Sequence, residues 1–449
     1  MTLATSAMSK SKKSLVAIQQ ANKYLSSFYN RSNKERGQGS SGLAWCMAGV
    51  PPELLGAFDV DMEFPENFGA HCASTLVATS FIEIAESEGY CSDLCSYLTN
   101  SMGYVKRYKD LGAVPPESPL KQGMGEPTMM MGSGYMCDPR LKWFQTMNTR
   151  YFNVPVFNSD PISPPFDVDI DDPRIAEHYT LQLRQDLHAQ VAFLEENTGK
   201  KLDPEKFLQR MANSQKALSL WHKIMALRKT RPCPMAAEDY FTAIIPQLFM
   251  LGAEEPVRFY EAILEEVTMR VEKGIGVIPN EKYRLMWAAG SIPPWFNLGF
   301  FNYLGTLGAV VVVGEGGYYA GEPMQIDLNP ADPLESLVQR TWRRACNLHR
   351  GKTVVAPECA NPAIFGIAGI DLFLKWAKEY QVDGALMHKT RSCRAASVGQ
   401  IHTKNLLEDA GINTLIFESD MADPRQWSDE RIKMQVEAFL EGLELTAAS

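Results

Sequence analysis

The strongest constraint on the fold is an alternation of short apolar segments with helical segments, on both sides of a long helical stretch. The short segments are "GLAWCM", "TMMMGS" and "VPVFNSD" before that stretch, and "KYRLMW", "GAVVVVG", "VDGALMHK" and "INTLIFESD" after it. The densest of them, "GAVVVVG", is typical of a buried strand. Strands that alternate with helices predict parallel sheets covered by helices, so the sequence indicates an α/β fold.

The middle of the chain interrupts this alternation. "PISPPFDVDIDDP" marks a boundary, and the pattern is almost wholly helical from Arg174 to Gly274. A chain of 449 residues is too long for one ordinary core. We predict a polar lead-in with one helix (1–40), a first α/β domain (41–165), a helical insertion (166–279) and a second α/β domain (280–449). No internal repeat of fixed period is visible in the sequence.

Composition and charge exclude several classes of protein. A hydrophobic content of 45% and a charged content of 22% are typical of globular proteins, and a net charge of −9 argues against nucleic acid as the main partner. The early lysines are not followed by an apolar signal region, and no run of about eighteen apolar residues occurs. We therefore expect a cytoplasmic protein without a membrane partner.

Three of the nine cysteines lie near predicted helix starts. "CASTLVATSFIEIAESEGY" predicts one amphipathic helix, and "CSDLCSYLTNSMGYVKRYKDLG" a second, capped by Ser92 or Asp93, with Cys95 in its first turn. Cys137 and Cys393 fall at strand-to-helix turns. Because the carboxyl ends of parallel strands face one crevice, these thiols can converge despite their separation in sequence.

The surroundings of Cys393 favour a thiolate. Unpaired amides at a helix start carry partial positive charge, and Arg391 and Arg394 add full charges beside the sulfur. Both effects lower the pKa of a thiol, and the thiolate is the form that binds metals. Plain burial of the three thiols remains the alternative interpretation.

The other cysteines have simpler interpretations. "CSDLC" lacks a second close pair, so a zinc ribbon is not indicated. Five cysteines are predicted to be small buried hydrophobic residues: Cys46, Cys72, Cys91, Cys233 and Cys346.

Several polar residues lie close to the last thiol in sequence. His388 could donate a proton to a substrate, or could be a hydrogen-bonded structural histidine. Glu418, Asp420 and Asp423 could orient a loop or transfer protons, but the pattern favours helix capping or pairing with Arg425.

The segments "SDLCSY", "CDPRLKWF", "YQVDGALMHKTRSC" and "FESDMADPR" resemble the benzoyl-CoA reductase and 2-hydroxyacyl-CoA dehydratase family. The resemblance extends from about Ala44 to about Glu441. The length and the helical insertion are most similar to the larger (B- or O-type) cluster-binding subunit of ATP-dependent benzoyl-CoA or methylbenzoyl-CoA reductases. The resemblance implies two flavodoxin-like parallel-sheet domains with a helical insertion.

The resemblance also implies a cofactor and its ligands. It assigns a [4Fe–4S] cluster, single or part of a larger double cluster, to Cys95, Cys137 and Cys393. Some members supply a fourth cysteine at a position that corresponds to Cys359, although the segment around Cys359 matches poorly.

The implied activity is reduction of the aromatic ring of benzoyl-CoA, or of a substituted benzoyl-CoA, to a cyclohexadiene-carbonyl-CoA. The implied partners are the aryl-CoA thioester, a homologous smaller cluster-binding subunit and ATP-hydrolysing electron-activating subunits. The chain itself has no G-x-x-x-x-G-K-[ST] motif, which fits ATP hydrolysis on another subunit. A subunit of a 2-hydroxyacyl-CoA dehydratase and a non-catalytic electron-transfer subunit are the alternatives.

Overall fold

The computed structural model describes residues 12–20, 40–134, 137–159, 168–288, 290–314, 326–350 and 370–448. Two four-stranded parallel sheets form its framework, and they confirm the predicted α/β class with two flavodoxin-like sheets. The first sheet has the spatial order β2 (Asp61–Glu63), β1 (Leu43–Cys46), β3 (Met129–Ser133) and β4 (Val156–Ser159). The second has the order β6 (Ala309–Gly314), β5 (Tyr283–Trp287), β7 (Gly384–Thr390) and β8 (Thr414–Ser419).

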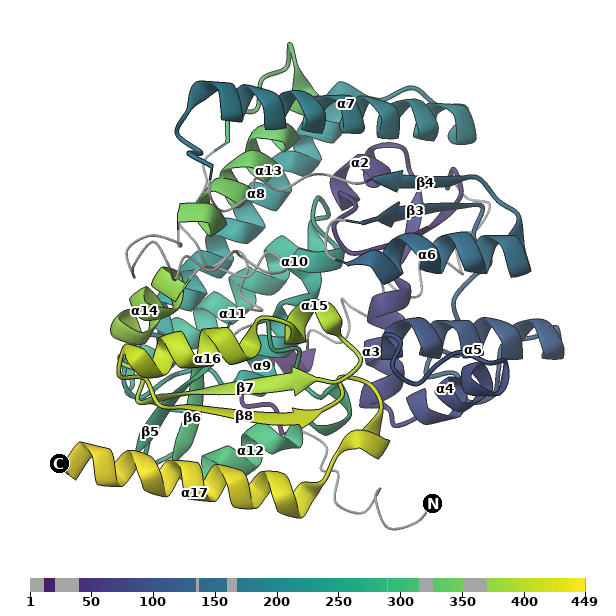
Figure 1. Ribbon diagram of the computed structural model, residues 1–449. Coiled ribbons are helices and arrows are strands. Elements are labelled where there is room, and N and C mark those ends of the chain that lie inside the picture. Colours follow the sequence, from purple (N-terminus) through teal and green to yellow (C-terminus); the bar gives the residue numbers. More distant parts are fainter. Residues whose placement is uncertain are drawn as a thin grey trace.

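The two sheets have the same strand order. In each, the earliest strand lies second, between the next strand along the chain and the one after it. Figure 1 shows that the strands of the two sheets run toward one another, because the arrowheads of β3 and β4 point to the second sheet and those of β7 and β8 to the first. The carboxyl ends of both sheets therefore face the boundary between the two halves.

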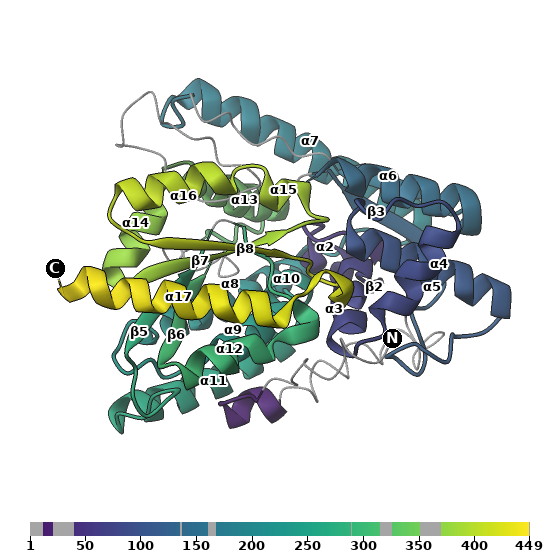
Figure 2. The same ribbon diagram turned by 60° about the horizontal axis from the view of Figure 1, so that its bottom comes forward.

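Both faces of the sheets are buried. In β1, Leu43 and Trp45 pack into one hydrophobic cluster, whereas Ala44 and Cys46 pack into another on the opposite face. This arrangement explains why the strands are apolar throughout instead of alternating with polar residues. In Figure 2 the second sheet is seen nearly edge-on, with α16 (Gln400–Asp409) on one side and α17 (Asp429–Ala448) on the other.

The single helix predicted for "CASTLVATSFIEIAESEGY" is wrong. The chain forms α3 (Pro65–Ser74) and α4 (Ala78–Ser87), which meet at 120°. Leu76 has a φ of 62°, and the amides of Leu76 and Val77 bond back to the last turn of α3, so the helix ends in a left-handed cap. Within the described ranges, no single helix is long and apolar enough to cross a membrane.

The helical stretch between the sheets was predicted correctly as helical. It contains α7 (Pro173–Thr198), α8 (Pro204–Leu227), α9 (Ala237–Ala243), α10 (Ile245–Phe249) and α11 (Glu255–Glu272). Asp172 and Asp203 cap α7 and α8 by accepting bonds from backbone amides. Helix α8 joins the two halves, because Phe207 lies in the core of the first and Trp221 in the core of the second.

Two segments pack away from their neighbours in sequence. Helix α13 (Pro333–Arg350) follows β6 of the second sheet, yet its Trp342 stacks on Tyr179 of α7 in the core of the first half, with ring centroids 5.8 Å apart. In the described part of the lead-in, Leu15 and Ile18 pack into the core of the second half. The remaining elements are α2 (Pro52–Ala57), η1 (Asn148–Phe152), η2 (Trp295–Asn297), α12 (Gly299–Thr306), α14 (Ile370–Glu379) and η6 (Pro424–Gln426).

Candidate functional site

Three cysteines occupy the N-cap positions of three helices. Cys95 precedes α5 (Ser96–Leu111), Cys137 precedes α6 (Asp138–Met147) and Cys393 precedes α15 (Arg394–Ser397). The predicted cap of α5 at Ser92 or Asp93 is wrong, because residues 91–94 form a separate turn closed by a bond from the amide of Leu94 to the carbonyl of Cys91. Each thiol therefore lies at a helix start, where backbone amides have no intrahelical partner.

The structure brings these three thiols together. Cys95 interacts electrostatically with both Cys393 and Cys137. Cys95 and Cys393 also border the hydrophobic cluster that lines the boundary between the halves. The first half thus supplies two thiols and the second half one. Cys359 lies outside the described residues.

The thiols are spread more widely than the ligands of a single metal ion. Among the residues that the structure describes, no three His, Cys, Asp or Glu side chains converge closely enough to hold one ion. A cofactor shared by these sulfurs would have to present a separate metal atom to each.

The predicted lowering of the thiol pKa by Arg391 and Arg394 is wrong. Burial raises the pKa of Cys393 to about 11 and also raises the pKa values of Cys95 and Cys137. The two arginines have other partners, since Arg391 donates to Gln426 and Arg394 pairs with Asp138 at 2.7 Å. Metal binding to these thiols would therefore release protons.

Backbone amides at the helix starts oppose the effect of burial. The amides of Leu98, Arg140 and Ala396 lower the pKa of the cysteine three residues before each of them. None of the three sulfurs accepts a capping hydrogen bond by strict geometry, so this influence is weaker than a full cap. The helix starts still provide the thiols with their nearest favourable dipoles.

The cation that faces the thiols is Arg140, which the sequence analysis missed. Its side chain is buried, and it lowers the pKa of both Cys137 and Cys393. It donates to one carboxylate oxygen of Glu66 at 2.5 and 2.8 Å and to the carbonyl of Ala48 at 2.9 Å. The signal in the sequence is its position three residues after the cysteine in "CDPR".

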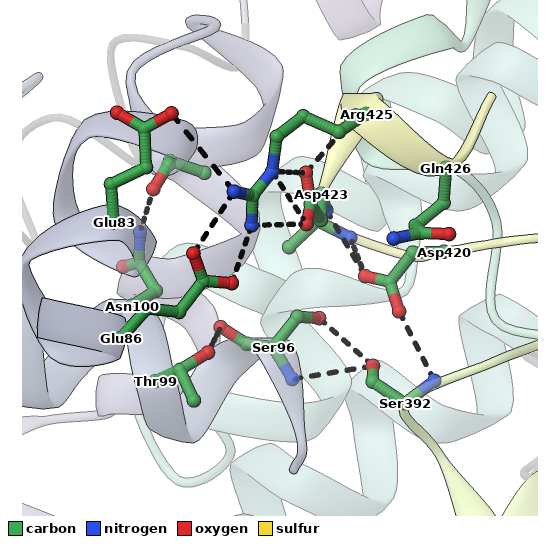
Figure 3. A network of polar contacts seen from close by, with 12 residues as sticks. Glu83, Glu86, Ser96, Thr99, Asn100, Ser392, Asp420, Asp423, Arg425 and Gln426 are labelled. Atoms are coloured by element: carbon green, nitrogen blue, oxygen red, sulfur yellow. Dashed lines mark hydrogen bonds and ion pairs between the residues drawn. The ribbon is translucent and has the colours of Figure 1, made fainter. Parts of the chain in front are cut away.

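Ser392 fixes the loop that carries Cys393 to the start of α5 (Figure 3). Its hydroxyl accepts a bond from the amide of Ser96 at 3.2 Å and donates to the Ser96 hydroxyl at 3.2 Å. Its amide donates to Asp420, whose other carboxylate oxygen accepts bonds from the amides of Ala422 and Asp423. The neighbours of two thiols, one from each half, are thus directly bonded.

Ion pairs join the two halves around the same point. Arg425 binds Glu86 of α4 at 2.7 Å and Asp423 at 2.8 Å, and Glu83 lies 3.9 Å away (Figure 3). The predicted capping by Asp420 and Asp423, and the pairing of Asp423 with Arg425, are confirmed. Glu418 pairs with Lys389 instead, at 2.9 Å.

His388 has a structural environment. It is fully buried, its Nε2 bonds to the Ser419 hydroxyl at 2.7 Å, and its Nδ1 bonds to the carbonyl of Ile292. Burial lowers its pKa to about 4. Because both ring nitrogens already have protein partners, the hydrogen-bonded structural interpretation accounts for this residue.

The interpretation of the other cysteines holds with one exception. Cys46, Cys72, Cys233 and Cys346 are buried. Cys91 is exposed, so its predicted burial is wrong. It lies in the turn that precedes α5, outside the hydrophobic clusters.

Comparison with known proteins identifies the family. The chain is 26% identical to the (R)-2-hydroxyisocaproyl-CoA dehydratase alpha subunit of Clostridioides difficile, over 97% of this chain and 98% of that protein. It is 24% identical to a subunit of benzoyl-CoA reductase from Thauera aromatica, over 92% and 91%. The alpha subunit of (R)-2-hydroxyglutaryl-CoA dehydratase from Acidaminococcus fermentans is 23% identical, over 92% and 94%. Residues 47–443 match the family model "2-hydroxyglutaryl-CoA dehydratase, D-component", and the chain therefore belongs to this family.

Proposed function

We propose that this chain is the iron–sulfur subunit of an ATP-dependent aryl-CoA reductase, and that Cys95, Cys137 and Cys393 hold its [4Fe–4S] cluster. The observation that carries the proposal is the convergence of three N-cap thiols from the two halves of the chain. The similarity to the benzoyl-CoA reductase of Thauera aromatica supports the substrate class.

The donor set fits such a cluster. Thiolates are the usual ligands of iron–sulfur clusters, and each binds a different iron atom. This requirement agrees with thiols that lie near one another but are too dispersed for a single ion. Arg140 and the amides at the three helix starts favour the negative charge that the ligands carry. Cys359 stays a proposal for a fourth ligand, and the cluster is either single or part of a double cluster.

A bound cluster would supply electrons of very low potential, a range that extends to about −700 mV. Net reduction of the ring adds two electrons and two protons to the aryl-CoA and gives a cyclohexadiene-carbonyl-CoA. The residues of this chain bury the site: Cys95, Cys137 and Cys393 are each only partly exposed, and Arg140 is buried beside them. Burial limits access of water and so protects a strongly reducing centre.

We further propose the partners of the chain. A homologous smaller subunit would complete the cytoplasmic enzyme, and an ATP-hydrolysing subunit pair would deliver the electrons. The chain is similar over nearly its whole length to proteins that are named as subunits, which supports an assembly of this kind.

A 2-hydroxyacyl-CoA dehydratase is the second candidate function, because two of the relatives above are dehydratase alpha subunits. In that case the same thiols would serve a reaction in which water leaves and the substrate undergoes no net reduction. A non-catalytic electron-transfer subunit is the third candidate, and it would leave binding of aryl-CoA to the partner subunit.

The test is replacement of each thiol in the complex, purified without oxygen together with its partner subunits. Cys95→Ala, Cys137→Ala and Cys393→Ala should each lower the iron content, whereas Cys233→Ala, a buried cysteine in the core of the second half, should not. Full iron content in all three variants would refute the proposed site.

The reaction is then assigned by its products. Ring reduction that consumes ATP supports the reductase, and loss of water from a 2-hydroxyacyl-CoA without net reduction supports the dehydratase. Binding of aryl-CoA to the isolated partner alone would favour the electron-transfer role.

A further inference from the structure

A buried ion pair lies directly beside the three thiols. The side chains of Arg140 and Glu66 are 7% and 12% exposed and approach to 2.5 Å. Arg140 donates to the carbonyl of Ala48, while the second carboxylate oxygen of Glu66 accepts the amide of the same residue at 2.8 Å. Because Ala48 follows β1, both charges are fixed at the carboxyl end of the first sheet.

The position of this pair needs an explanation, because burying two charges is expensive and rarely stabilises a fold more than apolar packing would. Opposite charges from the pair act on the same sulfur: Arg140 lowers the pKa of Cys137, and Glu66 raises it. Arg140 also interacts with Cys95 and Cys393. The pair therefore acts on the whole set of thiols.

Charge of either sign at this place affects the reduction potential of a metal cluster. One-electron reduction adds a negative charge to the cluster and, in the simplest case, no proton. A nearby positive charge stabilises the reduced form and raises the potential, whereas a nearby negative charge lowers it. Burial of the pair strengthens both effects, since little water screens them.

We propose that the Arg140–Glu66 pair sets the reduction potential of the cluster: Arg140 stabilises negative charge among the thiols, and Glu66 offsets that stabilisation so that the centre remains strongly reducing. This inference rests on the proposed function. Arg140 and Glu66 are positioning residues in this account, because they act on the cluster through its surroundings.

A redox titration of the anaerobic complex tests the inference. The midpoint potential is followed by electron paramagnetic resonance while titanium(III) citrate supplies the electrons. Arg140→Gln should lower the midpoint potential, because Glu66 then remains uncompensated. Glu66→Gln should raise it for the opposite reason. The double variant should return close to the wild-type value, and Arg140→Lys should change it less than Arg140→Gln.

A matched control is the Arg340–Glu53 pair, which joins α13 to α2 and is also largely buried. Arg340→Gln should weaken the fold but leave the midpoint potential unchanged. A merely structural role of Arg140 and Glu66 predicts the same result for their variants, so the potential separates the two explanations.

The outcomes distinguish this inference from the function beneath it. If Arg140→Gln and Glu66→Gln retain iron and keep the wild-type potential, the inference is overturned and the proposed cluster stands. If Arg140→Gln does not retain iron, Glu66→Gln decides alone: a raised potential supports the inference and an unchanged one overturns it. Absence of iron from the wild-type complex would overturn both.

Discussion

Gly103 lies where α5 crosses α4, and its replacement by alanine tests how closely the fold controls the site. A Cβ atom at this position would lie 1.7 Å from the carbonyl oxygen of Phe81 and 2.5 Å from its carbonyl carbon. The two helices would have to separate by about 1.5 Å to restore an ordinary contact. Because the obstacle is backbone, no side-chain rotation can relieve it.

The expected cost follows from two opposing effects. Alanine is favoured over glycine in a helix interior by about 1 kcal/mol. Overpacking costs about 1–3 kcal/mol, and a clash with backbone belongs at the upper end of that range. We therefore expect Gly103→Ala to lower the free energy of unfolding by about 2 kcal/mol. Because α5 begins after Cys95, the same displacement should also reduce the iron content of the complex.

Urea denaturation measures the cost, and Gly442→Ala is the matched control. Gly442 lies in α17, where an added Cβ would meet no atom within 4 Å. That variant should be as stable as the wild type or more stable by up to about 1 kcal/mol. If Gly103→Ala were as stable as Gly442→Ala, the reasoning about helix contact would be wrong.

Two further predictions concern pH and the boundary between the halves. The pKa of His388 is about 4 in the folded chain and 6.5 ordinarily, so between these values the unfolded chain binds a proton that the folded chain does not. The free energy of unfolding should therefore fall by up to about 3 kcal/mol as the pH decreases from 6.5 to 4, and urea denaturation of His388→Asn should show a smaller fall. Arg425→Gln removes the pairs with Glu86 and Asp423; because the arginine is 36% exposed and screened by water, the loss should be only about 1 kcal/mol. The difference between Arg425→Gln and the wild type should shrink in 1 M salt, and a difference that does not depend on salt would contradict the electrostatic origin.

The strands and the helix-start positions of the thiols could be predicted because both depend on local pattern. Apolar segments of strand length mark β3 and β7, and turn residues such as those in "CDPR" mark the helices that follow. The rule that strand ends share a crevice then brings Cys137 and Cys393 toward one region. None of these steps requires knowledge of tertiary contacts.

The rest depends on contacts that the sequence does not display. Arg140 and Glu66 are 74 positions apart, and nothing local to either indicates that they pair. Leu76 ends α3 in a left-handed conformation that is uncommon for a leucine, so composition alone gives no sign of the break. The thiol pKa values were misjudged because burial, a property of the folded chain, outweighs neighbouring charges.

The division of the thiols between two halves has a consequence for biosynthesis. Asp138 and Arg394, which follow the second and third thiols, are 256 positions apart. At about 5–20 residues per second, a ribosome needs roughly 10–50 s to travel from one to the other. During translation, the first two sulfurs therefore wait as an incomplete set, open to oxidation or to capture by the wrong ion. Maturation of the centre can finish only after synthesis has passed the last cysteine.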